Sequence, residues 1–128
     1  MPLVRIDLLQ GKSVEYRRAL GDAVHESMLA TINVPNDDRF QIVTEHPSND
    51  FIVDDNYLGI RRSVDCVIIQ ITLNDTRTVD QKRALYKTLA DNLNRRLGLR
   101  REDVFVSLVE VRKENWSFGN GEAQYAPP

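Results

Sequence analysis

The chain has 128 residues and a mass of 14.7 kDa, which is enough for one domain with a hydrophobic core and too little for two ordinary domains. Hydrophobic residues at 41% and charged residues at 28% are typical of a globular protein, and no apolar run approaches the roughly 20 residues of a membrane-spanning helix. Seventeen basic side chains against nineteen acidic ones give a net charge of −2, so neither nucleic acid nor a membrane is expected as a partner.

The first expected unit is a strand, a helix and a second strand. A half-buried strand is predicted over Leu3–Leu9, where apolar and polar side chains alternate. Ser13 can cap a helix that follows, because its hydroxyl accepts a bond from an unpaired backbone N–H. Pro35, which has no N–H, is expected to end this helix, and a return strand is predicted over Phe40–Glu45. The apolar stripe of the helix has the 3.6-residue period and consists of Tyr16, Leu20, Ala23, Val24, Ser27, Met28 and Ile32.

The second expected unit has the same order. Its first strand is predicted over Cys66–Leu73, and its helix begins at Thr78 and Gln81, which have the spacing of a capping box. Gly98 suits the left-handed position that ends a helix, and the last strand is predicted over Val104–Val111. Leucines recur every four residues along this helix, at Leu85, Leu89, Leu93 and Leu97.

The two units are copies of one another. A shift of 65 residues aligns segment 2–45 with segment 67–110 without a gap. Outside the repeat lie a turn-rich insertion, 46–64, and a C-terminal aromatic tail, 113–128, which is expected to pack over a sheet edge or onto a neighbouring subunit. The expected organisation is a single domain, 1–128.

Each unit is expected to be a right-handed crossover between parallel strands. Two β-α-β units in one small sheet predict an α/β fold, in the form of an α+β two-layer sandwich with both helices on one face. The other face of such a sheet needs a cover, and self-association is the simplest one. The chain is therefore expected to be a homo-oligomer.

Few side chains are candidates for chemistry. The sequence has no GxGxxG, GxxxxGK[ST], HExxH or GxSxG motif. His25 and His46 have no second ligand at metal spacing, so no metal site is expected, and His25 is expected on a helix face. Cys66 is the only cysteine, which excludes an internal disulfide, and its apolar neighbours indicate a buried, inert thiol. With an N-terminus unlike a signal peptide, these features favour a cytoplasmic protein.

Pro2 is the exception among these ordinary residues. Once Met1 is removed, Pro2 carries a free secondary amine. An α-amino group has an ordinary pKa of about 8, which burial lowers and neighbouring carboxylates raise. Such an amine titrates near neutral pH and can act as a base or as a proton donor. Because many proteins begin with Met-Pro, the dipeptide alone does not establish catalysis.

Longer motifs carry a resemblance to a known family. They are Pro2-Leu3 at the start of a strand, VPNDDRFQIV at 34–43, EHP at 45–47, LGI at 58–60 and NWSFGNGEA at 115–123. Together they resemble the tautomerase superfamily over nearly the whole chain, and more closely its branch that contains malonate semialdehyde decarboxylase and related tautomerases.

The resemblance implies a cofactor-independent enzyme, a homotrimer, with a small carboxylate as its substrate. In family terms Pro2 is the catalytic amine, and Asp38 matches the carboxylate that activates or orients water in the decarboxylase branch. Arg77 matches one of two arginines that hold the substrate carboxylate, as a guanidinium fork does with two parallel bonds. Trp116 and Phe118 match aromatic residues of the pocket wall.

One position departs from the decarboxylase pattern. Asp75 stands where the first of the two arginines is expected, and a carboxylate there repels an anionic substrate unless it turns away or is paired. Decarboxylation that depends on both arginines is weakened more than keto–enol tautomerisation, which needs mainly the amine and one carboxylate anchor. Arg62 also falls on a position shared with the family, without an assignable role.

Purely structural alternatives exist for the same residues. Asp38 is equivalent in the repeat to Asp103, so both could simply close a turn between helix and strand. Arg77 is equivalent to Lys12, and a cation before a helix is often only a solvated side chain. The aromatic pair in the tail could serve only as interface core.

Three functions follow from this reading. The leading expectation is a keto–enol tautomerase of small 2-oxo acids, with the Pro2 amine as acid and base and Arg77 holding the carboxylate. The alternative is a decarboxylase or hydratase like malonate semialdehyde decarboxylase, with cationic Pro2 and Asp38. A non-catalytic, ferredoxin-like ligand-binding module is the second alternative.

Overall fold

The computed structural model describes residues 2–128 and contains the expected elements in the expected order. The strands differ from the prediction by one residue at most at each end, and two of them agree at both ends. The elements are β1 (Leu3–Leu9), α1 (Val14–Thr31), β2 (Gln41–His46), β3 (Val67–Asn74), α2 (Val79–Leu97) and β4 (Val104–Val111).

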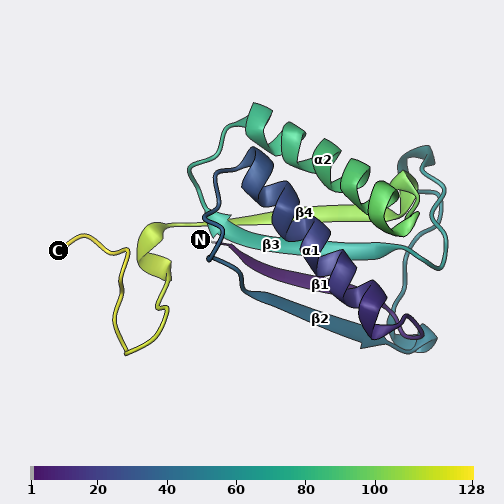
Figure 1. Cartoon of the computed structure of the whole chain (residues 1–128), viewed down its shortest axis with the longest axis horizontal. Helices are drawn as coiled ribbons and strands as arrows, with labels where there is room; N and C mark the ends of the chain where they lie inside the picture. Colours follow the sequence, from purple (N-terminus) through teal and green to yellow (C-terminus); the bar gives the residue numbers. More distant parts are fainter. Residues whose placement is uncertain (1) are drawn as a thin grey trace.

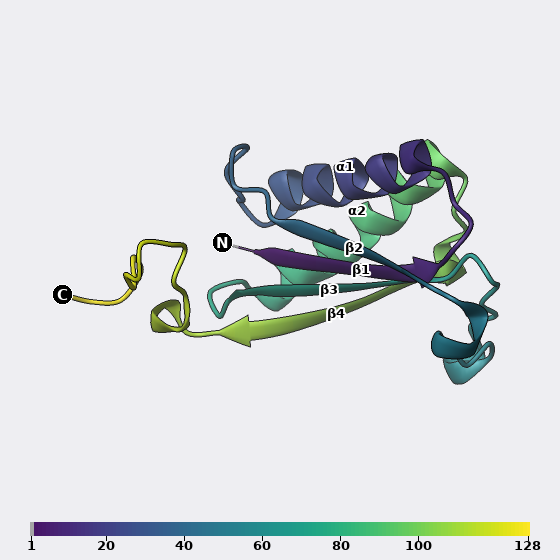
Figure 2. The same cartoon turned by 90° about the horizontal axis from the view of Figure 1, so that it is seen from below.

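The four strands form one sheet in the order β2-β1-β3-β4. Strands β1 and β2 are parallel, as are β3 and β4, whereas β1 and β3 meet antiparallel in the middle. The sheet therefore joins two β-α-β units side by side (Figure 1). Both helices lie on the same side of it, so the predicted two-layer sandwich is confirmed (Figure 2).

The helix boundaries follow local chemistry, with one difference from the prediction. The Ser13 hydroxyl accepts a bond from the N–H of Tyr16 at the start of α1, and the capping box of α2 is formed as expected. Helix α2 ends at Gly98 with φ of 65°, but α1 ends at Thr31, before Pro35 is reached. Asn33 has a φ of 57° and turns the chain there, so it takes the role that Gly98 has in the other half.

Equivalent residues of the two halves fill the core between sheet and helices. Leu20 and Leu85 are both fully buried, and several other pairs related by the repeat are buried as well. The core includes Ile6 with Ile71, Leu8 with Leu73, Val24 with Leu89 and Met28 with Leu93. Because equivalent side chains are buried in both halves, the duplicated sequence forms a sheet whose two halves are alike. None of the helices described is long and apolar enough to cross a membrane.

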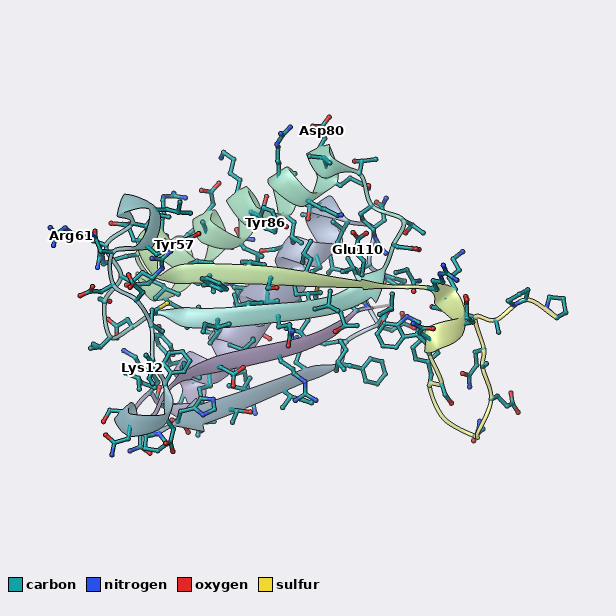
Figure 3. The ribbon with its side chains drawn as sticks, turned by 180° about the vertical axis from the view of Figure 1, so that it is seen from behind. Lys12, Tyr57, Arg61, Asp80, Tyr86 and Glu110 are labelled. Carbon is teal, nitrogen blue, oxygen red and sulfur yellow. The ribbon has the colours of Figure 1, made fainter. Side chains whose placement is uncertain are left out.

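The face of the sheet away from the helices carries both apolar and polar side chains. Ile42, Phe105 and Val109 are exposed there, although they are large and apolar. Polar Arg5 and Gln70 lie between them, opposite each other on the two central strands. Figure 3 views the molecule from this side, with the strands in front of the helices. The exposed apolar side chains are consistent with a face that is covered by another subunit.

The insertion and the tail lie at opposite ends of the sheet. Figure 3 shows Tyr57 and Arg61 of the insertion at one end, while the tail extends from the other end beyond the sheet. Arg62 Nη1 donates to the backbone oxygens of Asp54, Tyr57 and Ile60, at 3.2–3.4 Å. Arg62 therefore has a structural role, since it holds the backbone of the insertion in place.

Candidate active site

Strand register brings the chain start and three loops to one end of the sheet. Leu3 pairs with Thr72, so Pro2 lies beside the end of β3, where the loop to Arg77 begins. The N–H of Val4 donates to Phe40 O at 3.0 Å, which brings in the loop before β2. Strand β4 ends beside Asn74, through its pairing with Val111, and leads into the tail. Residues far apart in sequence thus meet at the start of β1.

Pro2 is buried in an apolar cavity at this end. The cavity has a volume of about 220 Å³ and is lined by Pro2, Leu3, Phe40, Trp116, Ser117 and Phe118. The structure therefore brings together three of the residues that the sequence singled out, Pro2, Trp116 and Phe118. The removal of Met1, on which a free Pro2 amine depends, lies outside the described residues.

The tail closes this cavity with a cluster of aromatic rings. Trp116 and Phe118 are stacked with their centroids 5.4 Å apart, and Phe118 meets Tyr125 edge-on at 4.8 Å. The indole N–H of Trp116 donates to Asn74 Oδ1 at 2.8 Å. Because Asn74 and Tyr125 line the neighbouring cleft, these contacts join the apolar cavity to a polar one.

The neighbouring cleft has a volume of about 710 Å³ and contains both Asp38 and Arg77. The Arg77 guanidinium donates to the backbone oxygen of Ile32 from Nε at 3.1 Å and from Nη2 at 2.8 Å. Its Nη1 has a long contact of 3.4 Å with Thr76 Oγ1. One N–H on each terminal nitrogen is left over, and these two can bind a ligand in the cleft. Arg77 thus holds the end of α1 and still presents a cationic edge.

Asp38 is a buried carboxylate, with 8% of its surface exposed. Its N–H closes a turn by donating to Pro35 O at 3.1 Å. Burial raises the pKa of Asp38 and the neighbouring Asp37 adds to this, whereas the charge of Arg77 acts in the opposite direction. A carboxyl group with a raised pKa is suited to hold or exchange a proton.

The counterpart of Asp38 in the repeat, Asp103, has different surroundings. The same turn is present, since the N–H of Asp103 donates to Arg100 O at 2.9 Å. The Asp103 carboxylate, however, accepts bonds from both the N–H and the hydroxyl of Ser63, each at 2.6 Å. The turn-closing alternative therefore describes Asp103 fully and Asp38 only in part, because Asp38 also lines the cleft.

His25 is more buried than expected for a residue on a helix face. It is 5% exposed, and its Nε2 lies 3.0 Å from Asn36 O. Because a carbonyl oxygen only accepts, Nε2 carries the proton and neutral His25 has a bare Nδ1. His25 ties α1 to the turn that carries Asp38. The helical stripe could have signalled this, since Met28, three residues further on and so on the same side of the helix, was assigned to the buried face.

The remaining candidates do not enter the cleft. Asp75 is exposed and is not among the lining residues, so its carboxylate does not face an anion bound there. Burial raises the pKa of Cys66 to about 11, which agrees with an inert thiol. His46 bonds to Asp7 at 2.6 Å and stacks on Phe51, at the opposite end of the sheet from Pro2.

Sequence reasoning missed one charged residue of the cleft, Lys113. It also missed four amide side chains of the lining, Asn33, Asn74, Gln81 and Gln124. Lys113 reaches the cleft because β4 ends beside β3, and Gln124 reaches it because the tail turns back on itself. No periodic pattern in the sequence reports either contact. The fold, an apolar cavity around Pro2 and an adjoining cleft with an arginine are features that suit a small enzyme working by acid–base chemistry.

Comparison with known proteins agrees with this class. Two family models, each described as tautomerase enzyme, match residues 38–119 and residues 2–61. The probable tautomerase YusQ of Bacillus subtilis (strain 168) is 42% identical, over 97% of this chain and 98% of its own. The chain belongs to the tautomerase family of enzymes.

Solved structures show the same relationship. A crystal structure of malonate semialdehyde decarboxylase, described with decarboxylase and hydratase activities, is 35% identical and has a TM-score of 0.91. The match covers 96% of this chain and 95% of that one. A fused 4-OT, described as a symmetric trimer, is 25% identical with a TM-score of 0.78, over 96% and 97% of the two chains. These relatives favour an enzyme over the non-catalytic module.

Proposed function

We propose that the chain is a keto–enol tautomerase of small 2-oxo acids, in which the Pro2 amine moves the proton and Arg77 holds the substrate carboxylate. The observation that carries the proposal is the juxtaposition of two unlike cavities. Pro2 lies in an apolar one and Arg77 in a polar one, and the Trp116–Asn74 bond joins them. A 2-oxo acid has the same division, with a charged carboxylate at one end and a less polar body.

The proposed reaction moves one proton between two atoms of the substrate. The carboxylate binds the two remaining N–H groups of Arg77, and the enol extends toward Pro2. The neutral amine takes the proton of the enol hydroxyl, the carbonyl forms, and the electron pair of the C=C bond takes the proton from the ammonium. Apolar surroundings favour the neutral amine at the start of this cycle, since burial disfavours a cation. Fixing both ends of the substrate lowers the entropic part of the barrier.

The other predicted site residues support this chemistry from around the reacting atoms. Trp116 and Phe118 form a wall beside Pro2 and exclude water from it. Asp38 orients a water molecule or the substrate oxygen from the neighbouring cleft. No step requires an oxidant, a reductant or a cofactor, because only a proton changes place.

The proposed active form is a homotrimer of single-domain chains, 1–128, in the cytoplasm. A fused 4-OT of similar structure is described as a trimer, and an oligomer would cover the exposed Ile42, Phe105 and Val109. The tail, which extends beyond the sheet, is positioned to contact a neighbouring subunit (Figures 1 and 2).

The test is the ketonisation of phenylenolpyruvate by the wild type and by Pro2→Ala, with protein whose intact mass shows that Met1 is absent. General acid–base catalysis contributes about 10²–10⁴-fold, so the variant should lose activity by that factor. Pro127→Ala, in the exposed end of the tail, is the matched control and should keep the wild-type rate. Equal rates for wild type and Pro2→Ala would contradict the proposal.

The second candidate is decarboxylation or hydration by a cationic Pro2, with Asp38 positioning water. It is supported by the similarity to malonate semialdehyde decarboxylase over nearly the whole chain. Against it, Asp75 stands where the decarboxylase pattern has an arginine, and Asp75 lies outside the cleft, so the second arginine of that pattern is missing. Incubation with malonate semialdehyde separates the two functions. Acetaldehyde release that is lost in Pro2→Ala supports this candidate, and no release excludes it.

A further inference from the structure

The cleft that holds Arg77 has a second cation, which the proposed reaction does not use. Lys113 begins a short helical turn, Lys113–Asn115, directly after β4. Val111 at the end of β4 pairs with Asn74 at the end of β3, and the two strands lead to Lys113 and Arg77 respectively. Both side chains line the same cleft of about 710 Å³.

Lys113 is available for a ligand in a way that other lysines are not. Lys82, near the same end of the sheet, is paired with Glu110 at 2.8 Å, and Lys12 is paired with Asp65 at 2.7 Å. Within residues 2–128, the Lys113 ammonium has no ion pair or hydrogen bond of its own. An exposed, unpaired cation at the rim of a cavity lowers the free energy of an anion bound inside it.

Three of the four amide side chains of the cleft also favour an anion, because their oxygen atoms are already occupied. Asn74 Oδ1 accepts from Trp116, Gln81 Oε1 from the N–H of Thr78, and Gln124 Oε1 from the N–H of Phe118. The amide nitrogens of Asn74 and Gln81 are left to donate. Against two cations and these donors, the cleft lining contains one carboxylate, Asp38.

We propose that Lys113 binds the substrate carboxylate together with Arg77, and that it makes the site selective for anionic over neutral substrates. The inference rests on the proposed function, in which Arg77 is the first anchor. The rigid Arg77 fork, held by Ile32 O, fixes the orientation of the carboxylate. Lys113, on a flexible four-carbon stem, adds charge without fixing an orientation.

A binding assay tests this without catalysis. Trp116 is the only tryptophan and lines the cavity beside the cleft, so its fluorescence can report on a bound ligand. The probes are 3-phenylpropanoate and its neutral analogue 3-phenylpropanamide. Lys113→Met should raise the Kd of the anion about tenfold, the effect of one charge-assisted hydrogen bond, and leave that of the amide unchanged. Lys113→Arg, which keeps the charge, should stay near the wild-type value.

The neighbouring cation provides the matched control. Arg112→Met removes the same charge from an exposed residue that does not line the cleft, and it should leave the Kd unchanged. Equal losses in Lys113→Met and Arg112→Met would show a general field effect and overturn the inference. Unchanged binding in Lys113→Met would also overturn it, as would a wild type that does not bind the anion.

Kinetics with phenylenolpyruvate separates this inference from the proposed function. Lys113→Met should raise KM with little change in kcat, because uniform binding is lost while the acid–base step is kept. If ketonisation depends on Pro2 but neither KM nor Kd depends on Lys113, the inference fails and the function stands. If the anion binds through Lys113 but no enol is ketonised, the function fails and the anion site stands.

Discussion

Replacing Asp103 with alanine should destabilise the fold, whereas the equivalent change at Asp38 should act on catalysis. Asp103 is fully buried, and its carboxylate accepts two bonds of 2.6 Å from the N–H and the hydroxyl of Ser63. Hydrogen bonds to a charged partner contribute about 1.5–3 kcal/mol each. Alanine removes both and leaves two donors without an acceptor, so the expected loss is about 3–5 kcal/mol.

Urea unfolding followed by far-UV circular dichroism measures this loss. All variants must be compared at one protein concentration, because association makes the midpoint depend on it. Asp103→Asn is an intermediate control, since its amide keeps one oxygen as an acceptor for Ser63. Asp38→Asn should leave the midpoint unchanged or raise it slightly, because burial already disfavours the charged form of Asp38.

Activity measured on the same proteins completes the comparison. Asp38→Asn should reduce turnover of phenylenolpyruvate, while Asp103→Asn should retain turnover as long as the protein is folded. A wild-type midpoint for Asp103→Ala would refute the reasoning, since it would mean that the buried bonds to Ser63 contribute nothing. A wild-type rate for Asp38→Asn would assign Asp38 to the same turn-closing role as its counterpart.

Three further predictions concern the site and the insertion. Because the pKa of Asp38 is raised in the fold, ionisation of its carboxyl group opposes folding. The free energy of unfolding of the wild type, relative to that of Asp38→Asn, should therefore fall as the pH rises through and above the ordinary aspartate pKa of about 3.9. A difference between the two proteins that does not change with pH would contradict this. His25→Leu removes the donor to Asn36 O, so it should lower the free energy of unfolding in urea by about 1–3 kcal/mol and should also lower kcat. His25→Gln, which can still donate, should lose less. Equal losses in the two variants would rule out the hydrogen bond. Arg62→Met frees three backbone carbonyls of the insertion, so proteolytic cleavage within 46–64 should become faster while kcat stays unchanged. An unchanged cleavage rate would show that Arg62 does not restrain the segment.

The sequence predicted the fold well, because alternation and capping are local signals. Strand β1 carries a regular polar–apolar alternation, and α2 is bounded by a capping box and Gly98, so both were located closely. The end of α1 was placed too late because Pro35 is a conspicuous stop signal, whereas the left-handed Asn33 has only a weak one.

The site was predicted in part, and the difference has a physical cause. The grouping of Pro2 with Trp116 and Phe118 came from the family resemblance, and the cavity places the three together. Lys113 escaped notice because its place beside Arg77 depends on where β4 ends against β3, a tertiary contact that leaves no periodic trace. The burial of His25 depends likewise on the turn that packs against α1.

The duplication has a consequence for how many active sites one chain can have. An α-amino group exists only at the first residue, so of two equivalent strand starts only the one at Pro2 can carry a free amine. At Val67, which takes the place of Pro2 in the second half, the nitrogen is part of a peptide bond within the sheet. In the second half, Asp103, the counterpart of Asp38, instead accepts two hydrogen bonds from Ser63. Of two structurally equivalent ends of one sheet, only one can therefore present a free amine, and a chain of this kind has one proposed active site, not two.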